Sequence, residues 1–137
     1  PLGTTNWSPA WSLGVGWGDF TLHTTIEGAI YCGTDIATRF TPSSTGCGTG
    51  AIVVNNTYNI VFTYNGTIGA IYKNGVFLTS QTMTPPLNPS NNSLLQFTNL
   101  YGSLSNAVHY NIQMYNRDLS ATEILQNYNS LKGRFGL

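Results

Sequence analysis

Residues 58–79 read YNIVFTYNGTIGAIYKNGVFLT, and this stretch decides the fold class. In 58–65 aromatic and aliphatic side chains recur at every second position, which predicts a β-strand. Two more short apolar runs follow at 68–73 and 76–79. The pairs Asn65-Gly66 and Asn74-Gly75 separate the runs, and both central residues of a type I′ hairpin turn need positive φ, which Asn and Gly tolerate. The stretch therefore predicts a three-stranded antiparallel meander with a type I′ turn at each Asn-Gly pair.

Beyond the meander, Pro85, Pro86 and Pro89 interrupt the chain, because proline cannot donate to a strand ladder. Strands are expected to resume at 94–100 and 107–115. The second of these shows a regular alternation. One face carries Val108, Tyr110, Ile112 and Met114, and the other carries His109, Asn111, Gln113 and Tyr115.

The region before the meander is less regular. Segments 20–26, 29–32 and 51–54 read as strands, and a fourth short extended piece ends at 39–42. The residues before position 20 show no clear periodicity, so no strand is predicted there.

One helix is predicted, at the end of the chain. Ser120-Ala121-Thr122-Glu123 has the spacing of a capping box, in which the Ser and Glu side chains each satisfy a backbone N–H of the first turn. Ile124, Leu125 and Tyr128 follow at helical spacing. We expect the helix to end between 129 and 133.

These elements predict one all-β domain covering residues 1–137. A chain of 137 residues fits a single domain, and neither an internal repeat nor a linker is visible. Many short strands with Gly- and Pro-rich turns favour an antiparallel β-sandwich. The predicted C-terminal helix packs on it.

The charge of the chain excludes several partners. Its five basic and five acidic residues give a formal net charge of zero, and 7% of the residues are charged. Without a basic excess we expect neither nucleic acid nor an anionic membrane as a partner. No apolar run approaches the roughly 20 residues of a membrane span. Little charge also means little repulsion between copies, which favours neighbours in an assembly.

Two parts of the chain resemble a known family. Residues 58–66 and 71–76 resemble the central hairpins of laminin-G-like domains in the concanavalin A-like lectin/glucanase superfamily. Residues 112–128 look like the closing strand and terminal helix of that family, and the tail 131–137 is similar to chain ends of such modules in bacteriophage and other virion proteins. The resemblance implies a jelly-roll fold, and carbohydrate on a cell surface as the target class.

The sequence departs from the family at its start. Laminin-G-like domains usually open with one or two strands that pair with the closing strand, which lies here near 108–115. Such strands are not obvious, so they either precede Pro1 in a longer chain or come from another polypeptide. A strand left unpaired exposes backbone polar groups. We therefore expect the chain to be part of an oligomer or of a larger chain, beside neighbouring virion or appendage subunits.

Catalysis is not expected. A retaining glucanase needs two carboxylates close together on one strand, and the acids do not supply such a pair. They are Asp19, Glu27, Asp35, Asp118 and Glu123. His23 and His109 have no nucleophile motif nearby. No cofactor is expected, with calcium as the one candidate, held by Asp19 or Asp35. The alternative role of these two residues is to cap turns.

Sugar binding uses exposed aromatic rings. The candidate rings lie in or beside segments rich in Gly and Ser, and the alternative is that they form core or subunit contacts. They are Trp7, Trp11, Trp17, Tyr31 and Tyr101. Cys32 and Cys47 either close a disulfide in an oxidising compartment or remain two free thiols.

The sequence thus predicts a non-enzymatic adhesion or decoration module on a virion surface or extracellular appendage, in contact with cell-surface carbohydrate. The alternative is a purely structural subunit of a capsid, tail or filament that binds no glycan. A glycoside hydrolase is a third class, disfavoured by the missing carboxylate pair.

Overall fold

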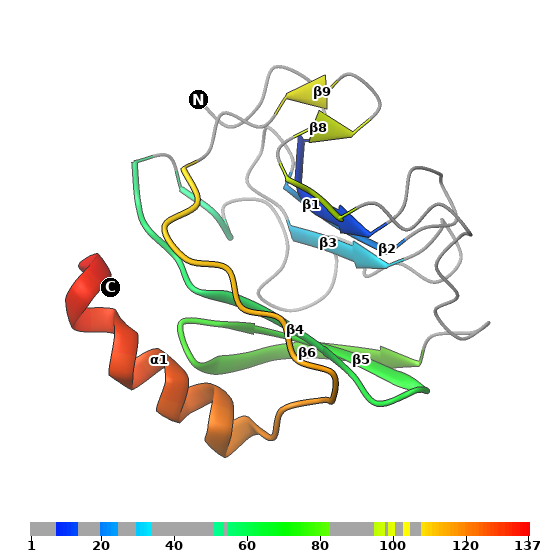
Figure 1. Cartoon of the computed structure of the whole chain (residues 1–137). Coiled ribbons are helices and arrows are strands. Elements are labelled where there is room, and N and C mark those ends of the chain that lie inside the picture. The colour runs from blue at the N-terminus through cyan, green and yellow to red at the C-terminus, as the bar shows by residue number, and fades with distance from the viewer. Residues whose placement is uncertain are drawn as a thin grey trace.

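The computed structural model describes antiparallel strands, one C-terminal helix and some of the residues that connect them (Figure 1). The backbone is described for residues 8–13, 20–24, 30–33, 51–53, 55–82, 95–97, 99–100, 103–104 and 108–137. Side chains are described for 51–53, 55–82 and 108–137. The strands are β1 Ser8–Leu13, β2 Phe20–Thr24, β3 Ile30–Gly33, β4 Ile60–Tyr64, β5 Ile68–Lys73, β6 Val76–Thr82, β7 Leu95–Phe97, β8 Asn99–Leu100 and β9 Ser103–Leu104. The helix is α1, Ala121–Phe135.

The predicted meander is confirmed. Strands β4, β5 and β6 form an open three-stranded antiparallel sheet in that order. Strand β5 has the predicted bounds, whereas β6 continues to Thr82, beyond the expected end at 79. Between β5 and β6 the register shifts, because Ile71 pairs with Thr79 and Tyr72 with Phe77. One extra residue on β6 produces such a bulge and increases the local twist.

The second hairpin turn also matches its prediction. Asn74 has φ 52° and Gly75 φ 78°, as a type I′ turn requires. The turn is tied to the residue that precedes β4, because Asn74 N–H donates to the Asn59 carbonyl at 2.8 Å. In return, Asn59 N–H donates to Asn74 Oδ1 at 2.9 Å.

The first hairpin turn differs from its prediction. Gly66 has φ 98°, but Asn65 is not among the residues with positive φ. The Asn65 side chain closes the loop instead, since its Oδ1 accepts from the N–H groups of Thr67 at 3.0 Å and Ile68 at 2.8 Å. A side chain that substitutes for a backbone acceptor removes the need for a type I′ turn.

A second sheet contains a strand that the sequence did not predict. Its order is β3-β2-β1-β7, and all of its described pairings are antiparallel. Strand β1 lies inside this sheet although it contains Pro9, and the register shifts between Pro9 and Trp11. A proline in an interior strand is tolerated at such an irregularity, because no ladder hydrogen bond is needed from it there.

The remaining strand predictions have mixed outcomes. The strands expected at 20–26 and 29–32 correspond to β2 and β3. The single strand expected at 94–100 divides into β7, which pairs with β1, and β8, which pairs with β9. The strand expected at 51–54 is wrong in its described part, because 51–53 lies outside any strand. The piece at 39–42 lies outside the described residues.

Helix α1 begins as predicted and ends later. Ser120 Oγ accepts from Glu123 N–H at 3.3 Å, and Glu123 Oε2 accepts from Ser120 N–H at 2.9 Å, so the capping box is confirmed. The helix continues to Phe135, past the expected end between 129 and 133. Gly136, with φ 68°, ends it instead, because the last carbonyls are satisfied there by a left-handed cap.

The helix meets the sheet at the Asn74-Gly75 turn. A Cβ added to Gly75 would lie 2.9 Å from Tyr128 Cδ1 and 3.1 Å from Leu125 Cδ1, so the turn backbone packs directly on α1. Ile71 of β5 and Ile124 of α1 are the largest fully buried side chains among the described residues. Glycine at position 75 therefore serves both the turn and the helix contact.

We predict that Gly75→Ala destabilises the protein by about 2 kcal/mol or more, because a side chain at positive φ is strained and the methyl group would overlap Tyr128. Gly66→Ala is the matched control. Its φ is also positive, but nothing lies within 4 Å of the added Cβ, so strain alone should cost about 1 kcal/mol. Urea unfolding of both variants measures the difference. Equal losses would contradict the contact between the turn and α1.

Candidate functional site

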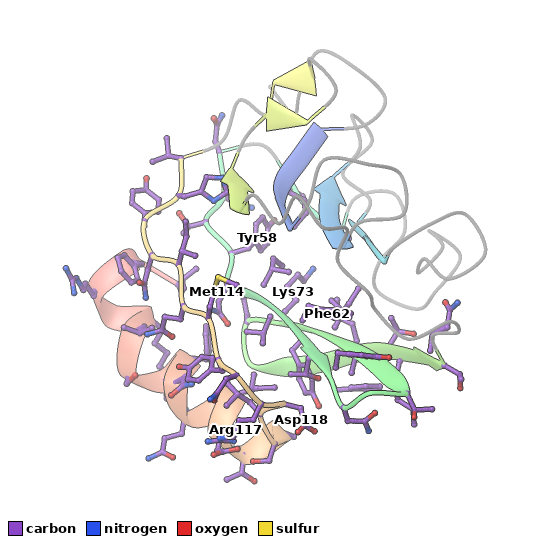
Figure 2. The ribbon with its side chains drawn as sticks, turned by 45° about the vertical axis from the view of Figure 1, so that its right-hand side comes forward. Tyr58, Phe62, Lys73, Met114, Arg117 and Asp118 are labelled. Atoms are coloured by element: carbon purple, nitrogen blue, oxygen red, sulfur yellow. The ribbon has the colours of Figure 1, made fainter. Side chains whose placement is uncertain are left out.

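An exposed segment without Lys, Arg, Asp or Glu lies shortly before α1 in the chain. Residues 108–116, which we call the connecting segment, read VHYNIQMYN and contain no Lys, Arg, Asp or Glu. In Figure 1 the segment crosses β4, and in Figure 2 it lies between α1 and the meander. In Figure 2, Met114 extends from it on the side away from α1.

Three side-chain contacts, at successive levels along the helix, join residues 110–117 to α1. The Tyr110 and Phe135 rings stack with centroids 6.0 Å apart. Asn127 Nδ2 donates to the Tyr115 hydroxyl at 3.2 Å. The third level is an ion pair between Arg117, just beyond the segment, and Glu123. Since later positions of the segment meet earlier positions of the helix, the two run antiparallel.

Figure 1 shows that the connecting segment follows an elongated path. Phe135 and Asn127 are eight residues apart, or about 12 Å along a helix. Tyr110 and Tyr115, which contact them, are five residues apart, and five residues fully extended span roughly 17 Å. The spacing of these contacts along α1 fits an extended segment.

The expected strand at 107–115 is nevertheless wrong for the described residues 108–115, which belong to no strand. Val108 is 75% exposed, and Ile112, in the middle of the run, is 46% exposed. Among the described residues, the backbone of 110–116 has no hydrogen-bond partner. Apolar and polar residues do alternate in the sequence. The segment is held by side chains of α1, however, and not by hydrogen bonds to a neighbouring strand.

Aromatic and amide groups lie together on this surface. The Tyr115 hydroxyl donates to Gln113 Oε1 at 3.2 Å and accepts from Asn127. Tyr110 and Tyr115 are 62% and 48% exposed. Rings beside amides are the chemistry that holds uncharged sugars, because rings stack on the sugar face and amides bond its hydroxyls. The sequence reading missed this group because it assigned these tyrosines to a strand within a sheet.

A second cluster surrounds Lys73 and is structural. Its Nζ donates to the Ala51 carbonyl at 2.8 Å and lies 5.4 Å from the centre of the Tyr58 ring. The Tyr58 hydroxyl accepts from Val53 N–H at 3.1 Å. Figure 2 shows Tyr58 and Lys73 near each other above the meander. These contacts attach residues 51–58 to β5 and leave the ammonium group engaged by the protein itself.

The carboxylate of Glu123 is fully engaged at the start of α1. Arg117 donates to Oε1 at 2.6 Å and to Oε2 at 3.1 Å, and the Ser120 hydroxyl donates to Oε2 at 2.8 Å. The hydrogen bonds from Arg117, followed by those from Ser120, lower the pKa of Glu123 from 4.5 to about 2. A carboxylate ionised at every ordinary pH does not donate a proton, so Glu123 is unsuited to act as a general acid.

The residues proposed from sequence do not belong to the connecting segment. Trp11 belongs to β1, and Tyr31 and Cys32 belong to β3. Trp11 pairs with Leu22 whereas Tyr31 pairs with His23, so the two aromatic residues occupy different rows of the sheet. The other candidates lie outside the described residues: Trp7, Trp17, Tyr101, Asp19, Asp35 and Cys47. The described side chains of 51–53, 55–82 and 108–137 contain no group of three metal-ligating residues.

Comparisons with known proteins give little. No family model and no curated protein matches the chain. Among solved structures, an S-layer domain-containing protein from Clostridium thermocellum ATCC 27405 matches with 18% identity and a TM-score of 0.47, over 93% of this chain and 65% of that one. The chain thus spans less than two thirds of that structure, and neither fold nor function follows from such a likeness. Within the described part of the chain, no helix is long and apolar enough to cross a membrane.

We predict that acid destabilises the protein partly through Glu123. Its folded-state pKa is below its unfolded value, so its contribution is complete above pH 5 and is lost as the pH falls toward 2. Thermal unfolding between pH 6 and pH 2 measures this loss. Glu123→Gln should have a lower Tm than the wild type at pH 6 and a smaller fall in Tm on acidification. Parallel falls in both proteins would contradict the assigned role.

Proposed function

We propose that this chain is a non-enzymatic adhesion or decoration module of a virion or extracellular appendage, with cell-surface carbohydrate as its target. The observation that carries the proposal is the connecting segment, an uncharged and exposed row of tyrosine, amide and apolar side chains held on a helix. Such a surface offers stacking and hydrogen bonds but no formal charge, which suits a neutral sugar.

The rigid support of the segment favours recognition over catalysis. Tyr110 and Tyr115 are held by Phe135 and Asn127 of α1, so little side-chain freedom is lost when a sugar stacks on them. Weak contacts of this kind become useful when many copies act together, because binding at one site raises the local concentration at the next. An appendage or virion surface provides that multiplicity.

The proposed architecture is a laminin-G-like jelly-roll sandwich of the concanavalin A-like type. The antiparallel pairing of the described strands and the position of α1 after them in the chain support it. In this arrangement Trp7, Trp11, Trp17, Tyr31 and Tyr101 are further candidates for sugar contact. Calcium bound by Asp19 or Asp35 and a disulfide between Cys32 and Cys47 are parts of the same proposal.

The absence of catalysis is also proposed, and the state of Glu123 supports it. Glycoside hydrolysis needs one carboxyl group that is protonated near neutral pH and a second that is ionised. Glu123 is held ionised by Arg117 and Ser120, and it serves the start of α1. It therefore fits a structural role better than the role of a catalytic acid.

A structural subunit of a capsid, tail or filament is the second candidate function. The exposed apolar side chains of Val108, Ile112 and Met114 favour it, because apolar groups on an uncharged surface gain from burial against another polypeptide. In this reading the connecting segment contacts neighbouring subunits, and no glycan is bound.

Glycan binding tests the first candidate. We expect the wild-type chain, displayed in many copies on beads, to bind neutral polysaccharides in an array or in affinity electrophoresis. Tyr115→Ala should weaken binding about 3- to 10-fold, because one aromatic contact contributes roughly 0.5–1.5 kcal/mol. Tyr115→Phe keeps the ring and should retain most of the binding.

Phe77→Ala is the matched control, because Phe77 is a half-exposed ring on β6, away from the connecting segment in the sequence. Its loss should leave glycan binding unchanged. If the wild-type chain binds no polysaccharide in the multivalent format, carbohydrate is not the target, and the structural candidate remains.

A further inference from the structure

We infer that the connecting segment is the surface on which a second copy of this chain pairs, as an antiparallel β-strand related by a two-fold axis. This inference rests on the structural form of the proposed function, and it names the partner. The segment is nearly extended, exposed and without backbone partners among the described residues 110–116. These are the properties of a strand edge that accepts another strand.

The backbone groups of 110–116 can form hydrogen bonds with a neighbouring strand. Each non-proline residue in an extended segment presents one N–H and one C=O, and a neighbouring strand satisfies both in a regular ladder. Side chains alone hold the segment to α1, through Tyr110 and Tyr115. The backbone polar groups of 110–116 are therefore available to an incoming strand without breaking any described bond.

Charge favours a second copy as the occupant. A two-fold contact brings identical surfaces together, so every charged residue near the axis faces a like charge. Residues 108–116 contain no Lys, Arg, Asp or Glu, and the whole chain has a formal net charge of zero. Antiparallel pairing of the segment with itself about Ile112 therefore opposes no Lys, Arg, Asp or Glu within 108–116 to a like charge.

The side-chain pattern selects one register. Pairing centred on Ile112 puts Ile112 opposite its own copy, Tyr110 opposite Met114, and Asn111 opposite Gln113. Apolar groups then lie beside apolar groups and amides beside amides, which stabilises antiparallel pairs. Centring the pair between two residues would oppose apolar to polar side chains. Within 110–116, the register centred on Ile112 gives the longest run in which every opposed pair matches, because it opposes 110–114 of one copy to 110–114 of the other.

Exposure leaves room for the partner. Ile112 is 46% exposed and Met114 62% exposed, at and beside the proposed axis. Both faces of the segment are exposed, as expected of an extended segment that lacks a neighbouring strand. Pairing would therefore bury side chains that now lie in water, and this burial favours association.

A cysteine at the axis tests the register directly. Residues opposite one another in an antiparallel pair lie close enough for a disulfide. We expect purified Ile112→Cys to form a disulfide-linked dimer under mild oxidation. The wild-type protein controls for Cys32 and Cys47. Val76→Cys controls for pairing through β6, because Val76 is 62% exposed at the start of that edge strand. Neither control should cross-link.

Sedimentation velocity over a range of concentrations tests the dimer itself. The wild-type protein should associate reversibly into dimers, with little dependence on salt. Ile112→Lys places two ammonium groups at the axis and should give monomers, whereas Val76→Lys should still dimerise. Circular dichroism confirms that each variant is folded. Met114→Lys, at a more exposed position, serves if Ile112→Lys does not fold.

Three results would overturn the inference. They are a wild-type protein that stays monomeric at every concentration, a dimer that persists in Ile112→Lys or Met114→Lys, and cross-linking through position 76 without cross-linking through 112. These results concern association of the chain in solution, whereas glycan binding is measured separately, as retention of polysaccharide by protein arrayed on beads. Failure of the dimer and failure of the proposed adhesion function are therefore distinguishable.

Discussion

The structure depends on the way α1 holds an extended segment that belongs to no sheet. A backbone outside a helix or sheet must find other partners for its N–H and C=O groups or leave them in water. Here stacking of Tyr110 on Phe135, a hydrogen bond from Asn127 to Tyr115, and the Arg117–Glu123 pair set the path of the chain. The backbone of 110–116 has no hydrogen-bond partner among the described residues, and we propose that this surface contacts another molecule.

That arrangement needs a well-placed helix, and two local features place it. The capping box of Ser120 and Glu123 fixes where α1 begins, while Arg117 joins the same carboxylate and so ties the end of the connecting segment to the first turn. The Asn74-Gly75 turn then receives the helix, because only a residue without a side chain fits against Tyr128 there. The capping box and the Asn74-Gly75 turn thus together set the position of α1.

The sequence predicted these local features because each one is encoded by neighbouring residues. Alternation with Asn-Gly turns predicted β4, β5 and β6, and the spacing of Ser120 and Glu123 predicted the start of α1. The helix was predicted to end too early, because a glycine such as Gly133 often ends a helix. The residue that adopts the left-handed conformation and ends α1 is Gly136. Strand β1 was missed since Pro9 and the surrounding Gly and Ser hide its pattern. That 108–115 belongs to no strand could not be predicted. Alternating apolar and polar residues show that an extended segment has two different faces, but not whether another strand pairs with it. The tyrosine and amide group on that segment was missed for the same reason.

Amide hydrogen exchange of the full chain at high dilution, where copies do not meet, tests the central claim most directly. We expect the peptides covering 110–116 to exchange at nearly the rate of an unfolded chain. The amides of 60–64, 68–73 and 121–135, which lie in strands and helix, should be protected. Strong protection of 110–116 in the dilute protein would show that its backbone already has partners within one chain, and it would contradict an open segment held by side chains alone.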